Sequence, residues 1–140
     1  MNRLVLAVVA IMSSAIAPLS GESPSTQPII QASVCEILAH PKTFHGKRIR
    51  SQATVTAQVA YPMRMRLTDI DCIGELPVAL HTYVTGTRSY RRLVRYMRQG
   101  VPVEAALTGQ FVAVYGRNYF LMQSVSNVVP KRSDTLSVRP

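Results

Sequence analysis

The chain has 140 residues, with 16 lysines and arginines against seven acidic residues and a formal net charge of +9. This length suits one domain and excludes a multidomain architecture. The positive balance favours anionic partners or anionic surfaces, although solubility alone would also explain it.

The first 21 residues predict a secretory signal peptide. Arg3 supplies a short positive region, an apolar run extends from Leu4 to Met12, and small residues follow the run. The run is too short for a membrane span, which needs about 20 apolar residues. The alternative is an N-terminal core helix, but the segment lacks the polar face of such a helix. Removal of the peptide leaves a net charge of +8, because Arg3 is its only charged residue.

The sequence contains two cysteines, Cys35 and Cys72, and both follow the predicted signal peptide. In the oxidising compartment that export implies, an isolated pair usually forms a disulfide. The bridge would close a loop of about 38 residues and stabilise the fold by roughly 4 kcal/mol through chain entropy. Two free buried thiols and metal ligation are the alternatives, and the CxxC spacing of redox proteins is absent.

The region before the first cysteine predicts a linker and then a short helix. Residues 22–32 are polar and contain prolines, as linkers do. Ser33 and Glu36 have the spacing of a capping box, in which each side chain bonds to the other residue's backbone N–H. A helix is therefore predicted over residues 34–39. Pro41 ends it, because proline disfavours helical backbone in the preceding residue.

The clearest pattern in the chain is an alternation of side chains over residues 48–59. Odd-numbered positions carry apolar or small residues, and even-numbered positions carry Arg, Gln or Thr. An alternation of this length predicts a long, half-buried strand. The preceding residues 41–47 are predicted to form a turn in which Gly46 takes a positive φ.

Shorter patterns predict the rest of a barrel. Further strands are predicted at residues 63–68, 78–83, 101–115 and 119–129. Turns are predicted at residues 60–62 and 115–118, and a helix between the third and fourth strands. The chain is thus predicted to be mainly β, a five-stranded OB-fold-like barrel of antiparallel strands with a short N-terminal helix, over residues 33–129. Residues 130–140 form a polar tail, which is predicted to be flexible.

Four segments, VCEILAHPKTFHGKRIRSQATV, RLTDIDC, VPVEAALTGQF and YFLMQSVSNV, resemble small exported bacterial OB-fold-like proteins. The pattern of that family is a short helix with a cysteine, a Gly-Lys turn, a long strand, and a second cysteine after an acidic loop. The resemblance covers residues 33–129, and its sharpest points are Cys35, Gly46 and Cys72. The chain departs at Gln52-Ala53, where many such barrels have glycine. Because the family has no established activity, the resemblance implies a fold and little chemistry.

Residues 88–98 predict an amphipathic helix with a strongly basic face. On a helical wheel its five arginines fall within an arc of about 120°, opposite the apolar side chains. These are Arg88, Arg91, Arg92, Arg95 and Arg98. The helix has no acid at i±4 that could neutralise them, so the like charges cost stability. We expect a ridge that binds anionic surfaces by charge. The alternative is a solvated face in a basic protein.

A second basic group is predicted on the outward side of the first two strands, where OB-folds often bind ligands. It consists of Arg48, Arg50, Arg64 and Arg66. Single-stranded nucleic acid usually also requires aromatic stacking platforms, but the outward positions here hold Gln and Thr. Three aromatic residues are better explained as core or hairpin residues: Phe111, Tyr119 and Phe120. The sequence therefore disfavours nucleic acid, and an anionic envelope component or an acidic protein is the expected partner.

The remaining candidate chemistry is metal binding or acid–base catalysis. Copper or zinc handling in the periplasm is the alternative function, since His and Met suit such metals. Its candidate ligands are His40, His45, His81, Met63 and Met65. Both methionines lie on the apolar register of a strand, so core packing is preferred for them. Asp69 and Asp71 could act as general acid and base or bind a cation, but a simple turn is preferred. The sequence thus predicts a binding module without catalytic residues, metal or cofactor.

Overall fold

The computed structural model describes residues 27–58 and 62–131. The predicted signal peptide, most of the turn at residues 60–62 and the tail from residue 132 onward lie outside the described residues. The strands are β1 (Ile30–Gln31), β2 (Arg48–Gln58), β3 (Arg64–Thr68), β4 (Leu76–Leu80), β5 (Val103–Val114) and β6 (Arg117–Pro130). The helical segments are α1 (Val34–Ala39), α2 (Pro41–Phe44), the 3-10 turn η2 (Val84–Gly86) and α3 (Arg88–Arg98).

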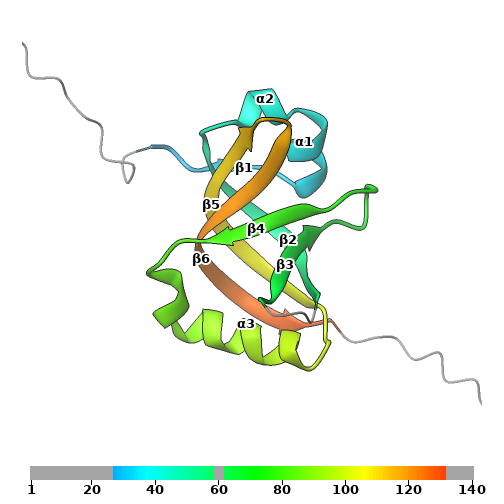
Figure 1. The fold of residues 1–140 in the computed structure, drawn as a ribbon, viewed down its shortest axis with the longest axis vertical. Helices are drawn as coiled ribbons and strands as arrows, with labels where there is room; N and C mark the ends of the chain where they lie inside the picture. The colour runs from blue at the N-terminus through cyan, green and yellow to red at the C-terminus, as the bar shows by residue number, and fades with distance from the viewer. Residues whose placement is uncertain (1–26, 59–61, 132–140) are drawn as a thin grey trace, which may run out of the picture.

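The sheet closes into a barrel because β2 is long enough to pair with two neighbours. Val55 of β2 lies opposite Leu67 of β3 and also opposite Val103 of β5. The strand order is β1-β2-β3-β4-β6-β5, and the β2–β5 pairing completes the ring (Figure 1). The five-stranded OB-fold-like barrel is therefore confirmed, with a short helix before it and α3 between its third and fourth strands.

One strand pair differs from the predicted antiparallel arrangement. β4 and β6 run parallel, with Val78 opposite Phe120 and Leu80 opposite Met122. The connection through α3 carries the chain across one end of the barrel before β5 begins, and the next hairpin returns β6 in the direction of β4. Parallel neighbours need such a long crossover, because a tight hairpin can join only antiparallel strands.

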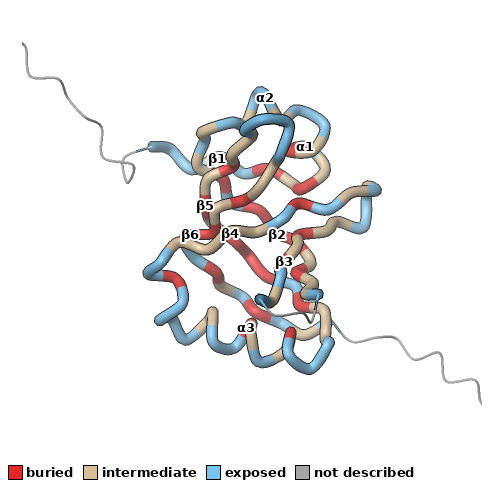
Figure 2. The backbone as a smooth tube through the Cα atoms, in the orientation of Figure 1, coloured by how far each residue is buried: buried red, intermediate tan, exposed pale blue. Residues whose placement is uncertain are grey.

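The core fills the barrel and is sealed by helices at both ends (Figures 1 and 2). Phe111 of β5 and Phe120 of β6 lie opposite each other and are fully buried. Ile37 of α1 is buried at one end, and Leu93 and Met97 of α3 are buried at the other. The alternation predicted for the first long strand is confirmed, since the odd-numbered positions of β2 from 49 to 55 are buried.

The segment around α1 confirms the capping box and adds a second short helix, α2. The Glu36 backbone N–H donates to Ser33 Oγ at 3.1 Å, and the Ser33 backbone N–H donates to Glu36 Oε2 at 2.7 Å. The latter bond lowers the pKa of the Glu36 carboxyl from its ordinary value. Pro41 ends α1 but also opens α2, where a turn was predicted, because proline suits the first position of a helix.

β1 lies inside the predicted linker. Ile30 is paired with Ile49 in parallel, and the Ala32 N–H donates to the Arg50 carbonyl at 3.2 Å. The cause is the free edge of β2, since β3 pairs only with its later half, from Thr54 onward. The incoming chain therefore satisfies backbone groups that β3 leaves open.

Several strand boundaries also differ from the sequence prediction. β4 begins at Leu76 and ends at Leu80, instead of covering residues 78–83. Pro77 has no backbone N–H to donate. It lies opposite Arg66 of β3, and the pairing of β4 with β6 starts only at the next residue, Val78. β5 and β6 are joined by a two-residue turn, Tyr115-Gly116, where four residues were predicted. Both turn residues have positive φ, as a tight hairpin of the I′ type requires.

Gly109 marks the closest approach of β5 and β6. A β-carbon added there would lie 2.3 Å from the Leu121 carbonyl oxygen and 2.7 Å from Phe120 Cε1. We predict that Gly109→Ala lowers the free energy of unfolding by about 2 kcal/mol, because overpacked cores lose roughly 1–3 kcal/mol. Gly86→Ala is the control, since its added carbon would meet nothing within 4 Å. Equal stability of the two variants in urea denaturation would contradict this account.

The predicted Cys35–Cys72 disulfide is confirmed. It joins α1 to the loop between β3 and β4, with the two Cα atoms 5.6 Å apart and a sequence separation of 37. We predict that Cys35→Ser combined with Cys72→Ser lowers the free energy of unfolding by roughly 4 kcal/mol through chain entropy. Reductant should destabilise the parent by a similar amount and leave the double variant unchanged. Thiol titration of the denatured, unreduced parent should find no free thiol, and two thiols per chain would refute the bridge.

Candidate functional site

α3 has well-defined ends that fix the direction of its side chains. At its start, the Thr87 hydroxyl donates to the Val84 carbonyl at 2.9 Å and accepts from the Tyr90 backbone N–H at 3.2 Å. At its end, Gly100 takes a φ of +71°, and the Val101 N–H donates to the Tyr96 carbonyl at 3.1 Å. This is a Schellman motif, in which a residue of positive φ ends the helix.

The apolar face of α3 packs mainly against the barrel. Leu93 and Met97 are 0% and 1% exposed, and the rings of Tyr90 and Tyr96 pack partly against the core. Burial raises the pKa of the Tyr90 phenol, although the positive charge of Arg98 opposes the shift. Because this face is held against β2, β5 and β6, the opposite face must point to solvent.

The predicted basic ridge is present as an exposed surface. Its five members are all exposed: Arg88, Arg91, Arg92, Arg95 and Arg98. Within residues 27–58 and 62–131, the ion pairs at 4 Å or less are Arg66 with Glu75 and Lys131 with Glu104, and neither involves the ridge. The positive charge of the ridge is therefore not neutralised by acidic side chains of the described chain.

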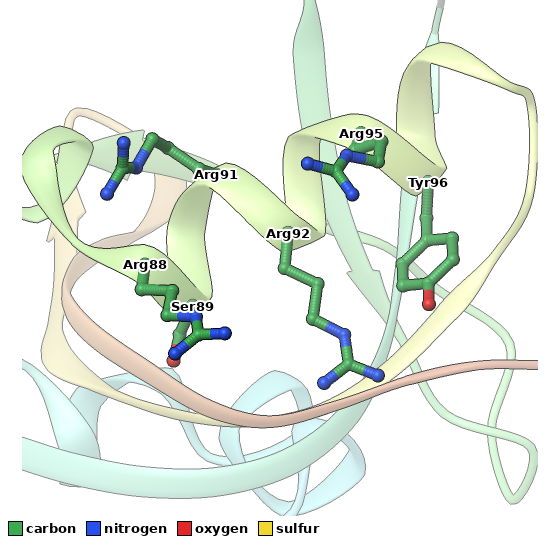
Figure 3. A pocket seen from close by; sticks show the side chains of 6 residues that line it. All are labelled: Arg88, Ser89, Arg91, Arg92, Arg95 and Tyr96. Carbon is green, nitrogen blue, oxygen red and sulfur yellow. The ribbon is translucent and has the colours of Figure 1, made fainter.

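The ridge is divided into two rows that border a hollow of about 670 Å³. Figure 3 shows Arg88, Ser89, Arg92 and Tyr96 directed to one side of the helix, and Arg91 and Arg95 directed away from them. These six residues line this first hollow. It therefore combines four guanidinium groups with two hydroxyl groups.

A second hollow of about 540 Å³ continues along the same helix. Its lining residues are Tyr90, Arg91, Val94, Arg95, Arg98 and Gln99. Arg91 and Arg95 line both hollows, whereas Arg88 lines only the first and Arg98 only the second. We call the two hollows together the α3 groove.

The chemistry of the α3 groove suits oxyanions. A guanidinium group offers a rigid fork of N–H donors that matches phosphate, sulfate or carboxylate oxygens in a bidentate manner. The Arg92 guanidinium carbon also lies 5.9 Å from the centre of the Tyr96 ring, so the ring holds this side chain close to the helix.

The structure separates the second predicted basic group into two pairs. They are Arg48 with Arg50, and Arg64 with Arg66. Arg50 lies opposite Thr108 at the start of β2, whereas Arg66 lies opposite Thr56 near its end. Positions 50 and 56 of β2 are about 20 Å apart at strand spacing. Arg66 also forms an ion pair with Glu75, so the four residues do not make one basic surface.

Four of the five candidate metal ligands make structural contacts in this fold. Met65 is buried and Met63 packs against the core, which confirms core packing for both. His45 Nδ1 accepts a hydrogen bond from the Ala113 backbone N–H at 3.0 Å, and the His81 ring lies tilted by 40° against the Tyr83 ring, with ring centres 4.1 Å apart. In the described ranges, no three His, Cys, Asp or Glu residues are grouped to hold a metal.

Other residues singled out by sequence also have structural explanations. The Asp71 N–H donates to Asp69 Oδ1 at 3.3 Å, which supports a simple turn for this loop. Phe111 and Phe120 are confirmed as core residues, and Tyr119 is half-buried in β6. No helix of the described residues is long and apolar enough to cross a bilayer.

Comparison with known proteins returns no match, neither to a family model nor to a curated protein. The candidate site is therefore inferred from the geometry of α3 and its side chains.

Sequence reasoning identified the ridge but missed the groove. Ser89 and Tyr96 were not assigned to the site. A helical wheel gives the angular position of each residue around the helix axis, but it does not give the orientation of the side chains. The available signal was the spacing of Arg88, Arg92 and Tyr96, since residues four apart form one row on a helix.

The crowding of positive charge should cost stability. Replacing Arg91, Arg92 and Arg95 by Gln removes all the i,i+3 and i,i+4 pairs among the ridge arginines, each worth a few tenths of a kcal/mol. We predict that the triple variant is more stable than the parent by about 1 kcal/mol at low salt, and that the difference shrinks as salt screens the charges. Denaturant titrations at two salt concentrations measure it. Leu93→Ala should instead lose about 2–5 kcal/mol at either salt.

Proposed function

We propose that this protein is an exported, non-enzymatic binding module that holds anionic ligands or envelope surfaces through the basic ridge of α3. The observation that carries the proposal is the set of five exposed arginines on one helix, without an acidic partner within 4 Å among the described residues. A charged row that destabilises its own helix is best explained by an external anion that relieves the repulsion.

Export is supported by two features of the chain. The N-terminal stretch has the composition of a signal peptide. The Cys35–Cys72 bridge is of the kind that persists in oxidising compartments. The resemblance to small exported bacterial OB-fold-like proteins supports the same compartment. An envelope offers anionic lipid, lipopolysaccharide and cell-wall polymers as partners, and also acidic proteins.

Two features favour α3 over the sheet face as the binding surface. The arginines of β2 and β3 are split between the two ends of β2, and one of them is already neutralised by Glu75. The copper or zinc alternative has less support, because Met63 and Met65 pack in the core and His45 Nδ1 accepts a backbone hydrogen bond.

The proposal is tested with the Arg91→Gln, Arg92→Gln, Arg95→Gln variant. Each arginine near an anionic surface contributes about 1 kcal/mol, so the loss of three should weaken binding roughly 100-fold at low salt. We expect the variant to leave a heparin column at distinctly lower salt than the parent, and to be retained less on vesicles that contain anionic lipid. The fold should stay intact, because the buried face of α3 is unchanged.

The matched control removes the same charge from the opposite end of the barrel. Lys42, Lys47 and Arg117 are exposed and lie in or next to α2 and the β5–β6 hairpin, away from α3 (Figure 1). Their combined replacement by Gln should lower the eluting salt much less than the α3 triple variant does. Equal shifts for the two triple variants, or no shift for the α3 variant, would show that the ridge is only a solvated face.

A further inference from the structure

We propose that the anion bound by α3 is a linear glycan polymer bearing phosphate or sulfate groups, and that it lies along the helix in the α3 groove. This inference rests on the proposed function and adds to it the class and orientation of the ligand. The bound chain would contact both arginine rows at once, with its anionic groups in the two hollows.

The spacing of the rows suits a repeating ligand. Arg88 and Arg92 are four residues apart, as are Arg91 and Arg95, so the Cα atoms in each row are about 6 Å apart along the axis. From Arg88 to Arg98 the groove extends over about 15 Å. A single small anion can occupy one hollow, whereas a polymer can occupy both because the hollows share Arg91 and Arg95.

The burial pattern argues against a membrane as the main partner. Helices that lie in a bilayer interface insert their apolar face between lipids, but Leu93 and Met97 of α3 are buried against the barrel. The large apolar side chains exposed in the described residues all lie outside α3. They are Ile29, Ile70, Ile73, Tyr83, Val114, Tyr115 and Val129. Contact of α3 with a flat bilayer would therefore use charge alone.

The uncharged groups in the groove favour a glycan over nucleic acid. Ser89 and Tyr96 place hydroxyl groups beside the guanidinium groups (Figure 3), and Gln99 adds an amide in the second hollow. These groups can exchange hydrogen bonds with the hydroxyls of a sugar backbone. Single-stranded nucleic acid requires free aromatic faces for stacking. The ring of Tyr96 is half-buried and already lies beneath Arg92.

The test compares two double variants that remove the same charge from the same helix. Arg91→Gln with Arg95→Gln removes the residues that both hollows share, whereas Arg88→Gln with Arg98→Gln removes one residue from each hollow. The probes are a heparin disaccharide and a heparin octasaccharide, with calorimetry on the disulfide-bonded chain at one salt concentration. Lys42→Gln with Lys47→Gln is the control for loss of charge at the other end of the barrel.

We expect the parent to bind the octasaccharide at least about tenfold more tightly than the disaccharide, because only the longer chain reaches both hollows. The Arg91/Arg95 variant should lose about 30-fold in octasaccharide affinity, and the Arg88/Arg98 variant about threefold. The difference is expected because Arg91 and Arg95 line both hollows, whereas Arg88 and Arg98 each line only one. The control should lose less than either.

Three results would refute the binding of a glycan polymer in the α3 groove while leaving the proposed function in place. These are equal losses for the two α3 double variants, tighter binding to vesicles of anionic lipid than to octasaccharide at matched charge, and tighter binding to an oligodeoxythymidine of the same charge. They would indicate binding by net charge, by a membrane and by nucleic acid, respectively. Losses in both α3 variants no larger than in the control would instead refute the proposed function itself.

Discussion

The architecture depends on the insertion of Leu93 and Met97 of α3 into the open end of the barrel. A five-stranded barrel leaves apolar side chains uncovered at its ends, and these two residues are buried there at 0% and 1% exposure. The insertion also sets the chemistry of the surface, because a helix whose one side is fixed must present its other side to solvent. The Thr87 cap and the Schellman motif at Gly100 fix the helix ends, so the ridge stays in one orientation.

The two ends of the barrel are stabilised by different means, and the arginine ridge lies at the end without the disulfide. At the end opposite α3, the Cys35–Cys72 bridge holds α1 to the β3–β4 loop, and α1 contributes Ile37 to the core. At the α3 end, stability comes from apolar burial and helix capping without a covalent bridge, and repulsion among the arginines reduces it. A protein under selection for stability only would alternate these arginines with acids at i±4. Placing the repulsion on a helix that is anchored by its buried face keeps its cost small.

The sequence predicts most of this fold, and the failures have a common physical origin. Strict alternation from Ile49 to Val55 identifies the long strand, and the Ser33–Glu36 capping box locates α1, because both signals are local. β1, the parallel β4–β6 pair and the separation of Arg50 from Arg66 depend on which strands become neighbours. Strand register is a tertiary property. The order of strands in the sequence therefore places four arginines on two adjacent strands, but it does not show that the two pairs lie at opposite ends of β2. The ridge was predictable because it lies on one helix, whereas the groove depends on how individual side chains lean.

The location of the groove distinguishes it from the usual binding surface of an OB-fold. That surface is a sheet face, where a ligand contacts side chains from several strands and their loops. Here the basic side chains come from a single helix, so their relative positions are set by helical geometry and not by strand register. Substitutions on the outer face can therefore change charge, spacing or hydroxyl content without disturbing Leu93 or Met97, and substitutions in the barrel can change stability without moving the arginines relative to one another. Within eleven consecutive residues, the outer face therefore sets the charge, with only a small effect on stability through repulsion, and the buried face sets the packing.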